Sequence, residues 1–241
     1  MPLGNRFNPL TAQIESVQNN EFNPATYVQI QEDWIPRLTS GIWNWAFTNT
    51  GATWSVTNQQ LGAQYPGAIR QQITHSAANT SLSVGNLGTV AQTLLTGGAI
   101  RIDAVVRVQA PTTNVTVREY WLGLADTTTA TPTNAVFIGF NNSNFWRPRS
   151  VVGGVITTGT SVAAAVSNNV WTYLRIEINA AATSMSVFVN ATLVETIALP
   201  GTALALWPTF YFLSTSTAAA TAYFIDQDFY RFQKRFSTVR W

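Results

Sequence analysis

Cysteine is absent from this chain of 241 residues, which excludes disulfide bonds and thiolate metal sites. His75 is the single histidine, so we expect no transition-metal site either. Calcium ligation by Asp and Asn oxygens stays open, although no loop has the density of acidic residues that such a site needs. We therefore expect neither a metal nor another cofactor.

Long apolar runs are also missing. No stretch approaches the roughly 18 apolar residues of a membrane-spanning helix, and the start of the chain lacks the charged and apolar regions of a secretion signal. We therefore expect no membrane segment, and synthesis in a cytoplasm.

Charged residues make up only 10% of the chain, against roughly 25% in an average soluble domain. The formal net charge of +2 is too small to predict nucleic-acid binding. Lys234 is the only lysine, and the other cationic residues are all arginines. Because the planar guanidinium of arginine suits fixed ion pairs, we expect many of these charges in packed contacts.

Strands with a period of two account for most of the chain. Residues 100–109 place apolar side chains on one face and Arg101, Asp103 and Arg107 on the other, as in a half-buried strand. The segment 171–197 repeats the alternation on both sides of a turn. About eleven or twelve short strands without helical spacers predict antiparallel sheets packed face to face.

The two ends of the chain differ from this pattern. Residues 1–40 are polar, contain several prolines and show only a weak helical period, so we expect an irregular N-terminal arm or collar. Residues 41–235 form the predicted sandwich. Residues 236–241 form a predicted C-terminal docking tail.

Six motifs follow one another along the predicted sandwich: YPGAIRQQI (65–73), REYWLGLAD (118–126), NAVFIGFNN (134–142), W-x-x-L-R-I-E-I-N (from Trp171), VFVNATLVETI (187–197) and YFIDQDFYRF (223–232). In this order they resemble the concanavalin A-like (laminin G-like) jelly roll, in particular the versions carried on bacteriophage particles. The resemblance implies an all-β fold, an antiparallel two-sheet jelly-roll sandwich. It does not decide the function, because this architecture hosts enzymes, lectins and inert scaffolds alike.

The chain departs from the family at Ala191, where a glycine usually follows the asparagine of the hairpin. A two-residue hairpin turn requires positive φ at both central residues, which alanine tolerates poorly. We therefore expect a longer turn here, or a turn of another type.

The acidic residues show no catalytic arrangement. Glucanases of this fold carry alternating carboxylates on one strand, and the nearest match is Asp226 with Asp228. We expect Arg231 and Arg235 to neutralise this pair, and we expect His75 to be a surface or hydrogen-bonded residue. We name no catalytic residue, and the prediction is that the protein is not an enzyme.

One loop carries the best candidate for sugar binding. Residues 141–150 contain Asn144, Trp146, Arg147 and Arg149, which combine a stacking ring with groups that bond hydroxyls. The alternative is that Trp146 closes one end of the sandwich or lies in a subunit contact.

Both termini carry candidate docking residues. Trp34 lies beside two acids in the arm, where it either docks on a neighbouring subunit or caps the sandwich. The tail contributes Arg235, Arg240 and Trp241, basic and aromatic residues that could contact nucleic acid. We favour docking of this tail on the acidic surface of a partner protein.

The resemblance and the two terminal segments favour a non-enzymatic virion protein, a capsid decoration (cement) or head-spike subunit synthesised in the host cytoplasm and carried on the virion surface. Its expected partners are the major capsid or other virion proteins and further copies of itself, in a homotrimer or another cyclic oligomer. The alternative is a tail-fibre or baseplate module that binds a host surface glycan. A polysaccharide-cleaving enzyme is a third, remote option.

Overall fold

The computed structural model describes residues 27–33, 46–50, 53–59, 68–75, 78–86, 93–109, 115–127, 129, 131–142, 144–217 and 222–238. Every regular element in this part of the chain is a β-strand. None of the described residues belongs to a helix that is long and apolar enough to cross a membrane.

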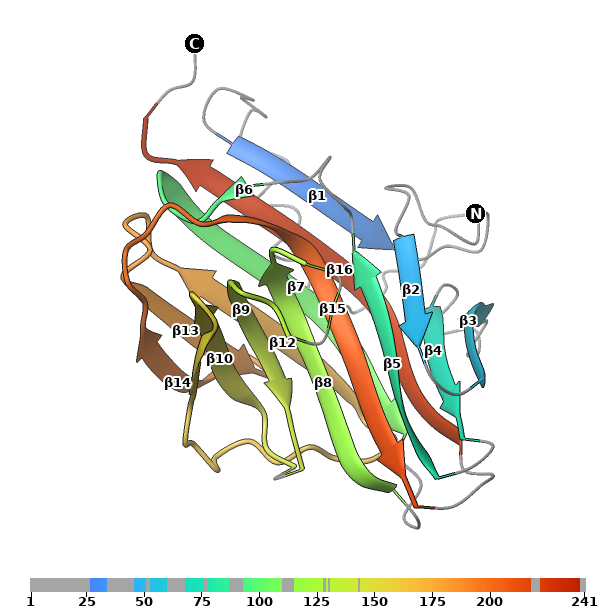
Figure 1. Ribbon diagram of the computed structural model, residues 1–241. Coiled ribbons are helices and arrows are strands. Elements are labelled where there is room, and N and C mark those ends of the chain that lie inside the picture. The colour runs from blue at the N-terminus through green and yellow to red at the C-terminus, as the bar shows by residue number, and fades with distance from the viewer. Residues whose placement is uncertain are drawn as a thin grey trace, which may run out of the picture.

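The strands form two antiparallel sheets of eight strands each. Figure 1 shows them as two layers, with β15 and β8 in front of β16 and β7. The first sheet has the order β14 (Thr192–Ala198), β13 (Ser184–Val189), β12 (Trp171–Ile178), β7 (Gly98–Gln109), β16 (Ala222–Phe236), β4 (Ala68–Thr74) and β3 (Thr53–Gln59), with β1 (Tyr27–Asp33) also paired to β16. The second sheet has the order β11 (Val155–Thr158), β10 (Arg147–Val152), β9 (Ala135–Phe140), β8 (Val115–Ala125), β15 (Ala205–Ser216), β5 (Asn79–Asn86) and β2 (Ala46–Thr50), with β6 (Thr93–Leu94) also paired to β15.

This arrangement confirms the prediction of an all-β, antiparallel two-sheet sandwich. The core lies between the sheets and follows the alternation read from the sequence, since every second residue of β12 is buried. Burying one such apolar side chain contributes about 1.5–3 kcal/mol. The core side chains that carry this contribution include Ile102, Leu122, Ile176, Val187 and Phe212.

The expected N-terminal arm contains a strand of the sandwich. β1 pairs with the second half of β16, from Tyr27 opposite Arg235 to Asp33 opposite Phe229. β4 pairs with the first half of β16, so β1 and β4 share one side of that long strand (Figure 1). The prediction of an irregular arm is therefore wrong for residues 27–33, whose few apolar side chains gave no clear alternation.

The hairpin between β13 and β14 has the two-residue turn that the sequence argued against. Asn190 has a φ of 48° and Ala191 a φ of 68°, while Val189 pairs with Thr192. The expectation of a longer turn or another type is wrong. The ladders on both sides hold the turn, so Ala191 adopts a left-handed conformation at a cost of about 1–2 kcal/mol.

Candidate functional site

The outer face of the first sheet carries a buried carboxylate surrounded by arginines. The Asp103 side chain has no exposed surface. Arg231 donates hydrogen bonds from Nε and Nη2 to its Oδ2, at 3.0 and 2.7 Å. Arg101 Nε donates to both carboxylate oxygens, at 3.1 and 2.9 Å, and the Tyr173 hydroxyl donates to Oδ1. Arg175 Nε lies 3.4 Å from Oδ1, and we call these five residues the Asp103 cluster.

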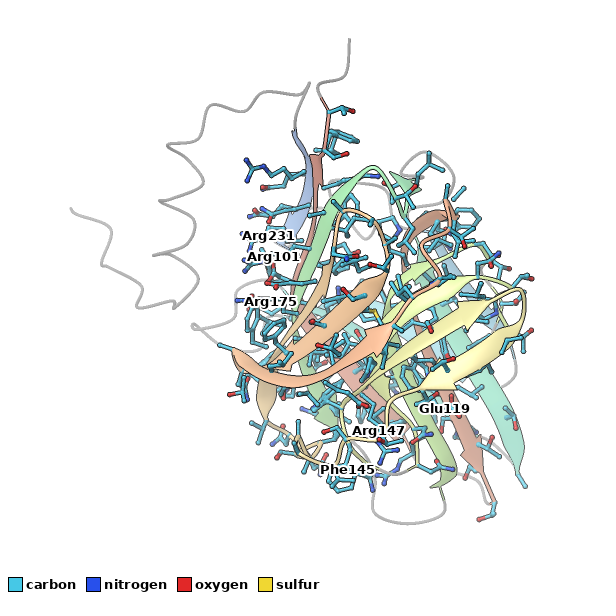
Figure 2. The ribbon with its side chains drawn as sticks, turned by 90° about the vertical axis from the view of Figure 1, so that its left-hand side faces the viewer. Arg101, Glu119, Phe145, Arg147, Arg175 and Arg231 are labelled. Carbon is cyan, nitrogen blue, oxygen red and sulfur yellow. The ribbon has the colours of Figure 1, made fainter. Side chains whose placement is uncertain are left out.

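Strand register assembles the Asp103 cluster. Asp103 lies on β7, directly opposite Arg175 of β12 and Arg231 of β16. Arg101 is two residues before Asp103, so its side chain points to the same face. Figure 2 shows Arg101, Arg175 and Arg231 together on one side of the molecule.

The electrostatics of the Asp103 cluster favour its charged form. Burial alone would raise the pKa of the Asp103 carboxyl. The hydrogen bond from Arg101, the charge of Arg231 and the hydrogen bond from Tyr173 outweigh burial and lower this pKa below its ordinary value. Burial and the nearby Asp103 charge raise the pKa of Tyr173, so its hydroxyl stays protonated and donates.

A second buried carboxylate, Asp226, lies on the same face with two arginines. Arg70 Nε lies 2.6 Å from Oδ1, and Arg107 Nη2 lies 2.7 Å from Oδ2. Both arginines sit opposite Asp226 in the strand register, Arg70 on β4 and Arg107 on β7. Aromatic rings cover them, with Phe224 4.7 Å from the Arg70 guanidinium and Trp171 4.8 Å from that of Arg107.

The acid pair in FIDQDF is therefore not a catalytic pair, but the neutralising partners of Asp226 differ from the predicted ones. Asp226 pairs with Arg70 and Arg107, whereas Arg231 pairs with Asp103. The reason is a β-bulge between Gln227 and Phe229, which changes the alternation along β16. Asp228 lies in the bulge and does not share the environment of Asp226.

A groove crosses the outer face of the first sheet beside the Asp103 cluster. Its volume is about 460 Å³, and its lining comes from β7, β12, β13, β16 and the residue that follows β12. We call it the outer groove. Its polar lining consists of Arg101, Glu177, Asn179, Ser184, Ser186, Gln233 and Arg235. These groups can bond hydroxyl oxygens as donors and as acceptors.

The predicted stacking ring, Trp146, lies in the core instead of on the surface. Its side chain is 1% exposed and packs edge-to-face on Phe140, with the ring centroids 5.3 Å apart. The indole is therefore not available to a sugar. The placement fits the alternative that Trp146 closes one end of the sandwich.

The other three residues of that loop do not form one surface. Arg147 Nε donates to the Ser161 carbonyl oxygen at 3.0 Å, and Arg149 Nη1 donates to the Tyr211 hydroxyl at 2.7 Å. Asn144 is exposed at another position, where its Oδ1 accepts from Arg118 at 2.8 Å. In Figure 2, Arg147 lies well apart from the Asp103 cluster.

The candidate docking residues are described only in part. Arg235 is exposed and lines the outer groove. Trp34, Arg240 and Trp241 lie outside the described residues. The neighbouring Lys234 is 3% exposed and donates from Nζ to the carbonyl oxygens of Leu94 and Thr96, so it adds no charge to a basic tail surface.

His75 is not a catalytic residue in this arrangement. It is fully buried, and its Nε2 lies 2.9 Å from the Ser214 hydroxyl oxygen, so the expected hydrogen-bonded role fits and the surface role does not. Among the described residues no group of three or more His, Cys, Asp or Glu side chains could hold a metal ion.

Comparisons with known proteins identify the fold. No family model matches the chain, and no curated protein matches it. Among solved structures, the Ulex europaeus lectin II gives a TM-score of 0.56 at 12% identity, covering 87% of this chain and 99% of the lectin. The Emp47p carbohydrate recognition domain gives a TM-score of 0.56 at 9% identity, covering 88% of this chain and 99% of that domain. The fold is a concanavalin A-like jelly roll.

A third jelly roll of this kind occurs within a larger protein. A botulinum neurotoxin type C structure, described by its interaction with two ganglioside molecules, gives a TM-score of 0.55 at 11% identity. The match includes 89% of this chain but only 48% of the neurotoxin chain, so this chain spans about half of that structure. At these identities the likeness shows the jelly-roll fold alone.

Sequence reasoning did not single out the outer groove. The signal of the adjoining Asp103 cluster is nevertheless present, because three strands that pair in the jelly roll all carry arginine on their outward faces. These residues are Arg101 on β7, Arg175 on β12 and Arg231 on β16. Only the strand order could bring them together, and the order of β12, β7 and β16 is not readable from periodicity.

Proposed function

We propose that the protein is a non-enzymatic glycan-binding module that holds its ligand in the outer groove. The observation that carries the proposal is the lining of this groove by hydrogen-bonding side chains from four neighbouring strands. A carbohydrate presents many hydroxyls on a small apolar ring. Such a ligand needs several donors and acceptors at fixed positions, which the outer groove offers.

The Asp103 cluster supports binding by fixing one wall of the groove. Arg101 lines the groove while its Nε bonds both oxygens of the buried Asp103. A side chain already held in one conformation loses less entropy when a ligand arrives. Among the described residues that line the groove, two are cationic, Arg101 and Arg235, and one is a carboxylate, Glu177, a balance that favours acidic over neutral glycans.

The absence of catalysis is part of the proposal. Glycoside hydrolysis needs two carboxyl groups facing one bond, about 5–9.5 Å apart. Glu177 is the single carboxylate among the described residues that line the groove. Asp103 and Asp226 are fully buried in their arginine partners, so neither can act as a base on a bound sugar.

The test is a glycan array followed by calorimetry on the glycans retained. Ala99→Trp places a large ring in the groove from an exposed position and should abolish binding. Val155→Trp is the matched control, because Val155 is 71% exposed on β11 of the other sheet. Equal binding by both variants, or no glycan retained by the wild-type chain, would contradict the proposal. New reducing ends after incubation would contradict its non-enzymatic part.

The virion role expected from the sequence is a second proposal, and one observation supports its self-association. β14 is the last strand in the order of the first sheet, and Leu193 on it is 53% exposed. An edge strand with an exposed apolar side chain can pair with another copy. Native mass spectrometry should then show a trimer or another cyclic oligomer that Leu193→Lys weakens, and quantitative mass spectrometry of purified phage particles should detect the chain. A monomer absent from particles would refute this role and leave glycan binding untouched.

A further inference from the structure

A small pocket at one end of the sandwich is separate from the outer groove. It has a volume of about 150 Å³ and is lined by Val108, Arg118, Phe140, Asn144, Val166 and Tyr223, among others. Val108 lies near the end of β7, while Arg118 and Tyr223 lie near the starts of β8 and β16, so these three residues meet at the same end. We call it the end pocket. Figure 2 places Phe145, the neighbour of Asn144, at the lower end of the molecule.

Arg118 brings to the end pocket a positive charge that no carboxylate among the described residues balances. Its Nη2 donates to Asn144 Oδ1 at 2.8 Å, and its backbone N donates to Asn142 Oδ1 at 2.8 Å. Among the described residues it forms no ion pair, in contrast to the arginines of the Asp103 cluster. A guanidinium has five N–H donors, so most of them can serve a ligand.

Tyr223 brings a buried hydroxyl to the same pocket. Its side chain is fully buried, and the hydroxyl has no hydrogen-bond partner among the described residues. Burial raises its pKa, and the nearby charge of Arg118 acts in the opposite direction, so the hydroxyl is neutral and close to that guanidinium. Buried polar groups are nearly always bonded in native proteins, and an exception calls for a functional reason.

The rim of the pocket is held in place by backbone hydrogen bonds. Asn144 has a φ of 57°, and its carbonyl oxygen accepts from Val166 N at 2.8 Å. Trp146 N donates to the Ala164 carbonyl oxygen at 2.9 Å, which ties the two rim loops together a second time. The pocket is therefore preformed, and a ligand has little loop entropy to overcome.

We infer that the end pocket binds the carboxylate of an acidic sugar residue, with Arg118 as its ionic partner and Tyr223 as a second hydrogen-bond donor. A planar carboxylate matches the fork of a guanidinium, and the pair gains strength from the charge. The apolar side chains of Val108, Phe140 and Val166 face the carbon atoms of the ring. The space corresponds to about five water molecules, enough for a carboxylate and adjoining ring atoms.

The chemistry of the pocket favours a carboxylate over a phosphate. Arg118 is the one cationic side chain among the described residues that line it, which balances the single charge of a carboxylate. The inference rests on the proposed glycan binding only for the origin of the ligand. The recognition of the carboxylate rests on Arg118 and Tyr223 alone.

The experiment is calorimetric titration of the full chain with glucuronate, glucose and inorganic phosphate. Glucuronate should bind, and Arg118→Gln should weaken it at least about tenfold, as expected for a hydrogen bond to a charged group. Tyr223→Phe should weaken it about three- to tenfold while thermal stability is kept or raised, because the substitution removes an unbonded buried hydroxyl. If the Tyr223 hydroxyl served only the fold, Tyr223→Phe would lower the thermal stability and leave the affinity for glucuronate unchanged.

Arg235→Gln separates the two sites. Arg235 lies twelve residues after Tyr223 on β16, about 40 Å away at the rise of a strand. Loss of glucuronate binding in Arg235→Gln alone would place the anion in the outer groove and overturn the inference while keeping the proposed function. Equal affinity for glucose or for phosphate, or no binding of glucuronate, would also overturn it. Loss of glucuronate binding in Arg118→Gln, while the variant still retains the same glycans on the array, would support the inference independently of the outer groove.

Discussion

Arg231 and Asp103 form an ion pair that is almost completely removed from water. The Nη2 to Oδ2 distance is 2.7 Å, and the two side chains are 3% and 0% exposed. A pair this deeply buried is costly to form, because both charges lose their hydration. Replacing one of the two residues leaves the other charge buried without a partner. In this jelly roll it also fixes the neighbouring Arg101, and with it one wall of the outer groove.

Asp103→Asn should lower the free energy of unfolding by about 3–5 kcal/mol, because it leaves three arginines close together without their central carboxylate. Urea denaturation followed by tryptophan fluorescence measures the loss. Glu177→Gln is the control, since its side chain is 41% exposed and an exposed pair contributes about 0–1 kcal/mol. A loss of less than about 1 kcal/mol in Asp103→Asn, the size expected of an exposed pair, would contradict the stabilising role of this buried carboxylate.

Acid should weaken the fold through the same residue. The pKa of Asp103 is lower in the folded chain than in the unfolded chain, so its contribution is present above the unfolded value of about 3.9. The contribution is lost as the pH falls through the folded pKa, because only the unfolded chain binds the proton readily. The free energy of unfolding should therefore decrease as the pH is lowered below about 4, and Asp103→Asn should flatten this decrease. Parallel curves for the two proteins would refute the assignment.

The fold was predictable because its strands alternate clearly. The outward Arg101, Asp103 and Arg107 and the inward Ile100 to Val108 of one strand already distinguish the two faces of a sheet. β1 was not predicted because its residues lack a regular apolar alternation. Its strand conformation depends on the hydrogen-bonded pairing with β16. The alternation of apolar and polar residues thus predicts strands with a buried face. It misses strands whose position depends on backbone pairing with a neighbouring strand.

The site was less predictable because burial cannot be read from residue type. Trp146 has the chemistry of a stacking ring, yet the bridge between Phe145 and Ala165 and the contact with Phe140 hold it in the core. Asp226 has the spacing of a catalytic residue, but a bulge and two arginines define its environment. Such facts depend on the order of the strands, which is a property of the whole chain.

Ala191→Gly should raise the free energy of unfolding by about 0.5–1 kcal/mol. Ala191 has a φ of 68°, a conformation that glycine adopts without steric cost. Part of the gain is offset by the greater freedom of glycine in the unfolded chain. Ala198→Gly is the matched control, an exposed position in β14 with an ordinary φ, where glycine should cost about 0.5–1 kcal/mol. Equal changes at both positions would show that the turn stores no strain.

Lys234 should resist amine-specific acetylation in the folded protein. Its side chain is 3% exposed, and its Nζ donates to the Leu94 and Thr96 carbonyl oxygens, so a reagent can reach it only after local or global unfolding. Peptide mapping by mass spectrometry should find Lys234 unmodified under native conditions and modified in urea. Arg235, the exposed next residue, is the internal control and should react with an arginine-specific reagent in both conditions. Rapid acetylation of the native chain would mean that the end of β16 opens readily, and that the charge of Lys234 then joins Arg235 on the surface.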